Sequence, residues 1–229
     1  MKHLAHLLKW DTILLHRNKL FILAAVMAFL YIGLFFLLKP LGNLTNVLII
    51  LIYNDPVVTG YIFAGVMWMF DRNQNTLQAV AVLPVKVEKY LLSKILVLTA
   101  LSTLVAFIMT ITIRGFDFNF LQLFGSVVLS ALMFCCMGFI VGAVSKTFNQ
   151  FLMLSIPVFI ITAIPFLPLF GIGKYGYTAF IPSAGGIEIL RGAFETQSIF
   201  FTFLIWITAV FWALAMWFFA VKIVKSKML

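Results

Sequence analysis

Charged residues are scarce in this sequence. Only 10% of its 229 residues are Asp, Glu, Lys or Arg, whereas 64% are hydrophobic and the mean hydropathy is +1.14. Soluble domains carry about a quarter charged residues, so this composition excludes a soluble domain. The chain is therefore expected to have lipid, not water, as its main solvent.

Cysteine is nearly absent, and the common catalytic motifs are not found. Cys135 and Cys136 are adjacent within an apolar run, which favours small-residue packing over a disulfide or a metal site. The sequence has no G-x-x-x-x-G-K-[ST], H-E-x-x-H or G-x-S-x-G pattern and no G-x-G-x-x-G after a strand. We therefore expect no catalytic residue, cofactor or metal ion on this chain, and no enzyme activity.

Six apolar runs are each long enough to cross a bilayer, which takes about 20 helical residues. They cover residues 20–38, 47–70, 95–113, 120–144, 151–170 and 199–221. This pattern predicts an all-α integral membrane protein with six transmembrane helices and one transmembrane domain over residues 1–229.

The distribution of positive charge predicts the orientation of these spans. Twelve of the 16 Lys and Arg residues fall on the side of the N-terminus, and the other side holds only Lys39, Arg114, Lys174 and Arg191. The positive-inside rule therefore places both chain ends in the cytoplasm. Because the cations are scattered over loops and form no stripe, the net charge of +9 indicates orientation in a bilayer and no nucleic-acid partner.

Two cytoplasmic segments outside the spans have helical features. Residues 1–19 alternate apolar and basic residues at helical spacing and predict an amphipathic interfacial helix, although Asp11 falls on its apolar side. In the loop 71–94, Asn75 is placed to cap a short helix and Pro84 to end it. Leu77 and Val80 share a face of that helix, which favours docking of a partner over a plain linker.

The segment 171–198 is expected outside the membrane but is still apolar. Pro182 and Ser183 open a short helix in which Glu188 and Arg191 are spaced i, i+3, so that their side chains face each other. The segment is therefore predicted to re-enter the outer leaflet, with Glu188 and Arg191 in a structural role.

Two intramembrane features leave alternatives open. Asp55 is the one acid that could lie within a span, and Asn54-Asp55-Pro56 favours a helix cap or break over a proton or ion site. Gly138 and Gly142 form a G-x-x-x-G motif, which indicates close helix packing within the chain or in a dimer.

Several motifs in this order resemble the permease subunit of type-2 ABC exporters, and within them the fluoroquinolone export permeases. The resemblance covers the whole chain. It is carried by the amphipathic N-terminal helix and by the motifs Asp55-Pro56 through Gly60 to Gly65, Asp71-Arg72 into Asn75-Thr76-Leu77 and Leu83-Pro84, Tyr90 to Lys94, and Ile181-Pro182-Ser183 before Leu190-Arg191-Gly192.

The resemblance implies an ATP-driven export permease in the cytoplasmic membrane of a prokaryote. It implies cytosolic ABC ATPase subunits that hold ATP and Mg, a second permease, identical or paralogous, and a hydrophobic or amphipathic drug-like substrate. A coupling helix over residues 73–86 would meet the ATPase, and the coupling residues would be Asp71, Arg72, Asn75, Thr76, Leu77, Val80, Leu83 and Pro84. The second and fifth spans would line the substrate path, with Tyr61, Met67, Trp68, Phe159 and Phe166 as its candidates.

Two other classes of function remain open. An ion-gradient-driven secondary transporter would use Asp55 as its ion site, and a membrane scaffold or assembly protein would need neither nucleotide nor an ion gradient. ATP-driven transport through a copurifying ATPase would distinguish the ABC exporter from both of these classes.

Overall fold

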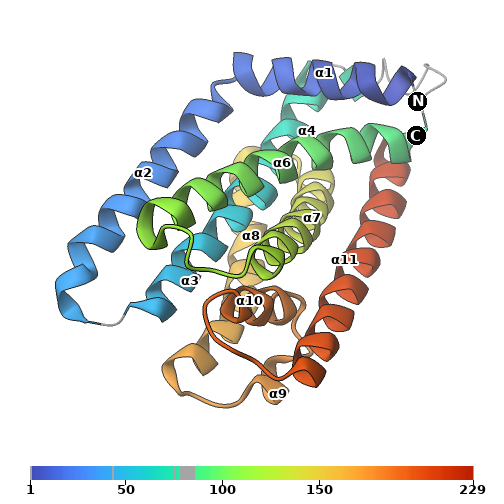
Figure 1. The fold of residues 1–229 in the computed structure, drawn as a ribbon. Helices are drawn as coiled ribbons and strands as arrows, with labels where there is room; N and C mark the ends of the chain where they lie inside the picture. The colour runs from blue at the N-terminus through green and yellow to red at the C-terminus, as the bar shows by residue number, and fades with distance from the viewer. Residues whose placement is uncertain (1, 43, 75, 78–85, 229) are drawn as a thin grey trace.

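The chain forms a bundle of membrane-spanning helices. The computed structural model describes residues 2–42, 44–74, 76–77 and 86–228. These residues are largely helical and include no strand, and six of the described helices are long and apolar enough to cross a membrane. The predicted all-α class with six spans is therefore confirmed. Both chain ends lie at the same end of the bundle, as an even number of crossings requires (Figure 1).

The first two helices meet at a corner. Helix α1 (Lys2–Arg17) lies across one end of the bundle, and α2 (Leu20–Leu38) runs along its length (Figure 1). Between them Lys19 adopts a left-handed conformation with φ of 58°, which ends one helix before the next begins. The N-terminal segment thus has the geometry expected of a helix lying at the membrane surface.

The second span changes its winding partway along. Helix α3 (Thr45–Asp55), the π-helical segment η2 (Pro56–Ile62) and α4 (Phe63–Asn73) form one continuous span, Thr45–Asn73. Pro56 has no N–H to offer to an α-helical turn, and the chain continues through wider turns instead of breaking. The α-helix therefore ends at Asp55, but the span continues through it and the Asp55 side chain caps nothing.

The remaining elements complete the bundle and its far end. The proline-rich end of the fifth span changes from α to 3-10 winding at Ile164, where Pro165 and Pro168 follow. Helices α9 and α10 lie at the end opposite α1 (Figure 1). In order the elements are η1 (Lys39–Leu41), α6 (Val87–Arg114), α7 (Phe120–Val144), α8 (Phe148–Ala163), η3 (Ile164–Phe170), α9 (Tyr175–Thr178), α10 (Pro182–Gly192) and α11 (Ile199–Met228).

The centre of the bundle is formed by α7 and the span Thr45–Asn73. In the apolar windows of these two spans 67% of the residues are buried, against 17% in the window of the last span. Close contact is possible because a Cβ at Gly138 would overlap the carbonyl oxygen of Tyr61, and one at Gly142 would lie 3.2 Å from the Cα of Gly65. The G-x-x-x-G motif therefore packs helices within the chain.

The alanine variant of Gly138 tests this packing. We expect Gly138→Ala to destabilise the detergent-solubilised protein by about 1–3 kcal/mol, because its methyl group meets backbone that cannot move aside alone. The measurement is the midpoint of thermal unfolding. Gly33→Ala is the matched control, since a Cβ at Gly33 meets nothing within 4 Å. Equal midpoints for the two variants would contradict the intramolecular role of Gly138.

Candidate functional site

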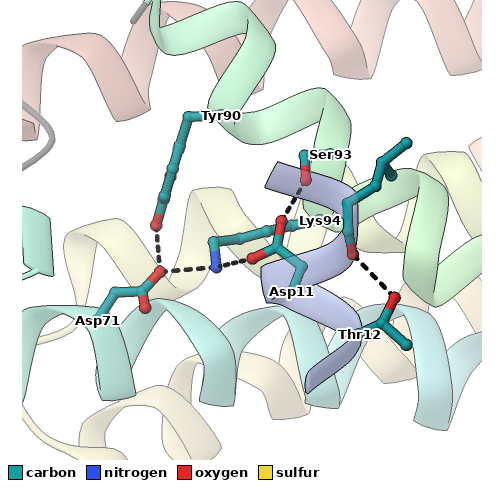
Figure 2. A network of polar contacts seen from close by, with 7 residues as sticks. Asp11, Thr12, Asp71, Tyr90, Ser93 and Lys94 are labelled. Atoms are coloured by element: carbon teal, nitrogen blue, oxygen red, sulfur yellow. Dashed lines mark hydrogen bonds and ion pairs between the residues drawn. The ribbon is translucent and has the colours of Figure 1, made fainter. Parts of the chain in front are cut away.

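Three segments of the chain converge at the predicted cytoplasmic end of the bundle. Asp71 lies on the last turns of α4, just before residues 74–86, and Lys94 lies on α6, just after them. From the surface, α1 brings Asp11 to the same place (Figure 2). Tyr90 and Lys94 are spaced i, i+4 on α6, so both side chains point to one side of that helix. The two flanks of the loop and the N-terminal helix thus share one site.

The ammonium group of Lys94 stands between two carboxylates. Its Nζ lies 2.9 Å from Asp11 Oδ1 and 2.9 Å from Asp71 Oδ2. The hydroxyl of Tyr90 donates to Asp71 Oδ2 over 2.5 Å, and the hydroxyl of Ser93 donates to Asp11 Oδ2. Figure 2 shows these contacts as one connected network. Each carboxylate therefore receives one charged and one neutral donor.

This network is buried. The side chains of Lys94 and Asp71 are 3% and 4% exposed, and that of Asp11 is 12% exposed. Charges removed from water are stable only when paired and hydrogen-bonded, and removing one partner leaves the others uncompensated. The network therefore fixes the positions of α1, α4 and α6 relative to one another.

The side chain of Arg72, the residue after Asp71, points to a different side of α4. Its Nη1 donates to the Ser145 carbonyl over 2.5 Å and its Nη2 to the Lys146 carbonyl over 2.6 Å. Both acceptors lie in the connection between α7 and α8. The end of α4 is therefore attached to the rest of the bundle on two sides.

The coupling residues expected from the resemblance divide into two groups. Asn75, Val80, Leu83 and Pro84 lie outside the described residues. Among the others, Asp71 and Leu77 are 3% and 7% exposed, so their side chains face the protein. Thr76 is half-buried. The coupling role of these residues stays a prediction, and the buried positions of Asp71 and Leu77 attach the loop to the bundle.

The candidates for the substrate path are mostly interior. Tyr61, Met67 and Trp68 are at most 1% exposed, so they pack inside this chain, and their place on a substrate path stays a prediction. Phe159 and Phe166 are half-buried. The ring of Phe159 lies 4.9 Å from that of Tyr61, and Phe166 packs in the same way against Tyr53 at 5.7 Å. A span that is apolar all round gives no periodicity by which core and path could be told apart.

Asp55 lies inside the second span. It is 1% exposed, and Ser102 on α6 donates to its Oδ2 over 2.7 Å. The neighbouring Asn54 donates to the hydroxyl of Tyr31 on α2. No ion pair joins Asp55 to a cation among the described residues. The carboxylate is therefore held by the hydroxyl group of Ser102 on α6.

The predicted re-entrant helix is α10, and it is inserted among the spans. Its residues from Ser183 to Leu190 are buried, and Ser183 donates to the carbonyl of Thr162 over 2.8 Å. Pro182 occupies the first turn, where its missing N–H is not needed. Burial raises the pKa of Glu188 above its usual value although Arg191 opposes the shift. The expected Glu188–Arg191 contact is 4.0 Å, and a shorter one of 2.7 Å joins Arg191 to Glu195.

The sequence alone does not reveal the network of Lys94 with Asp11 and Asp71. Lys94 was one of the loop cations that set the orientation, and Tyr90 and Ser93 were only parts of a motif. The one visible signal was Asp11, a charge on the apolar side of an amphipathic helix, because such a charge needs a partner in the protein.

Replacement of Lys94 tests the network. We expect Lys94→Met to lower the free energy of unfolding by about 3–5 kcal/mol, because two carboxylates then stay buried without their cation. Thermal or denaturant unfolding in detergent measures the loss.

The control for this substitution is Lys89→Met, which removes an exposed cation from the same helix. The triple variant Asp11→Asn, Asp71→Asn, Lys94→Met should recover much of the lost stability, because it removes all three charges together. A Lys94→Met variant as stable as Lys89→Met would show that the network does not hold the helices.

Comparisons with known proteins agree on one family. The profile of the fluoroquinolones export permease protein family matches residues 2–228. Fluoroquinolones export permease proteins from two strains of Mycobacterium tuberculosis, CDC 1551 / Oshkosh and ATCC 25618 / H37Rv, are each 27% identical over 146 residues. The matched region is 63% of this chain and 62% of the relatives' own length. No solved structure matches the chain. Because the profile covers nearly all of it, the chain belongs to the fluoroquinolones export permease protein family.

Proposed function

We propose that this chain is the membrane-spanning permease subunit of an ATP-driven ABC exporter. ATP and Mg²⁺ would be bound by a separate cytosolic ATPase, and the substrate would be hydrophobic or amphipathic and drug-like, as the names of the relatives suggest. The observation that carries the proposal is the Lys94 network, which ties both flanks of residues 74–86 to each other and to α1.

The network suits a segment of the protein on which a partner exerts a force. A force on the loop acts first on the residues that flank it, Asp71 on α4 and Lys94 on α6. Because these are paired in a buried site of low dielectric, where ion pairs are strong, the flanks and α1 move together. Closure of the ATPase pair would thus be transmitted to the spans as a rigid-body movement.

The outer faces of the later spans suit a second permease. Met153 and Ile160 on α8 are 70% and 63% exposed, and Phe218 on α11 is 73% exposed. Such apolar faces contact lipid or another membrane helix. A second permease, identical or paralogous, would complete a twelve-span exporter in the cytoplasmic membrane of a prokaryote.

A charge in the loop tests the coupling. Val80 lies outside the described residues and is chosen because it is one of the coupling residues that the family resemblance implies. We expect Val80→Asp to reduce ATP-driven export by about tenfold or more, since an acid in an apolar contact weakens docking by over about 1.4 kcal/mol. The measurement is ATP-dependent transport in inverted membrane vesicles that contain the ATPase.

Ile172→Asp provides the matched control, because Ile172 is 60% exposed in the connection after η3, at the opposite end of the bundle. It should leave transport and copurification of the ATPase unchanged. Normal ATP-driven transport by Val80→Asp would remove the loop from the coupling mechanism.

An ion-driven secondary transporter is the second candidate, and the burial of Asp55 without a described cation favours it. Under the ATP-driven proposal, Asp55→Asn should keep transport within about twofold, because Asn still accepts a hydrogen bond from Ser102. Transport is compared in vesicles energised by ATP or by an imposed ion gradient. Gradient-driven transport that needs no nucleotide and is lost in Asp55→Asn would favour the second candidate instead.

A further inference from the structure

A pocket of about 560 Å³ lies between α4 and the beginning of α8, at the predicted cytoplasmic end. One part of its lining is apolar and the other is polar and basic. The apolar part consists of Val66, Met69, Phe70 and Phe148, and the polar part of Arg72, Asn73, Lys146 and Thr147. This division, in a volume typical of small-molecule sites, suits a ligand with an apolar body and a polar head.

The charge of the polar part is positive. Arg72 and Lys146 are both in the lining, which includes no acid. The nearest acid in sequence, Asp71, is turned away and paired with Lys94. Helix α8 also begins here, with Thr147 accepting from the N–H of Gln150, and a helix start carries a partial positive charge. All three features favour an anionic head group.

The apolar part of the pocket is continuous with the membrane-facing surface. Phe148 is 48% exposed, and farther along the same helix Leu152 and Met153 are 41% and 70% exposed. A ligand that enters from the bilayer would therefore reach the pocket without crossing water. Basic pockets between spanning helices at the cytoplasmic surface bind the head groups of anionic lipids.

We infer that this pocket binds an anionic phospholipid, with its phosphate at Arg72 and Lys146 and an acyl chain along Val66, Met69, Phe70 and Phe148. Arg72 keeps N–H groups for the phosphate beyond those that hold the Ser145 and Lys146 carbonyls. The bound lipid would bridge the end of α4 and the turn before α8. The inference goes beyond the proposed function and does not depend on an ATPase.

Native mass spectrometry of the purified chain in detergent, titrated with phosphatidylglycerol or phosphatidylcholine, tests the inference. We expect phosphatidylglycerol to bind more tightly. Lys146→Gln should weaken its binding about fivefold, the effect of losing about one cation near a lipid phosphate. Val66→Trp should weaken it as well by filling the apolar part without changing the charge. Thermal unfolding confirms that both variants are folded.

The matched control is Lys222→Gln, which removes an exposed cation from α11 at the same end of the bundle and should bind like the unmodified chain. Three results would overturn the inference. The first is equal binding of phosphatidylglycerol and phosphatidylcholine. The second is an equal loss of phosphatidylglycerol affinity in Lys222→Gln and Lys146→Gln. The third is lipid that binds to the monomer but is absent from a dimer. The last result would mean that a second copy of the chain covers the pocket.

Discussion

Lys94 is the residue on which the arrangement of the predicted cytoplasmic end depends. Its ammonium group is 3% exposed and pairs with Asp11 of α1 and Asp71 of α4 at equal distances of 2.9 Å. Without it both carboxylates would be buried with no cation beside them, and desolvation of an unpaired charge costs several kcal/mol. The hydroxyl groups of Tyr90 and Ser93 satisfy further carboxylate lone pairs. The amphipathic helix α1, which would otherwise lie unattached on the bilayer surface, is thereby fixed to α4 and α6.

The end of α4 gains a second attachment because consecutive helical residues point in different directions, about 100° apart. Asp71 faces α6 and α1, whereas Arg72 faces the carbonyls of Ser145 and Lys146. Any movement of the following loop is therefore imposed on several elements at once. The apolar windows of the fifth and last spans are only 22% and 17% buried in the chain. The bundle thus combines a firmly connected end, predicted to be cytoplasmic, with spans whose outer faces are free for lipid or a partner.

The bilayer explains which features the sequence could predict. A hydrocarbon core demands long apolar helices and sorts cations by side, so the six spans and the interfacial helix were visible in composition and periodicity. The sequence does not show which way each side chain points within the bundle, because lipid-facing and buried surfaces are equally apolar. The burial of Tyr61, Met67 and Trp68 therefore has no sign in the sequence. For Lys94 the sequence shows a cation near a loop, and only the fold supplies its two acids.

The π-helical segment gives Asp55-Pro56 a structural consequence at the far end of the same span. A wider turn inserts extra backbone relative to an α-helix, and each inserted residue rotates everything after it by about 100°. Segment η2 (Pro56–Ile62) directly precedes α4, so it sets which residues of α4 face α6. A rotation by one residue in one sense would bring Arg72 into the direction of Asp71, so that Lys94 would face a cation. A rotation in the other sense would bring Asp71 into the direction of Arg72, so that the basic pocket would face an acid. The local winding that Pro56 imposes therefore decides whether the buried network and the basic pocket can both form.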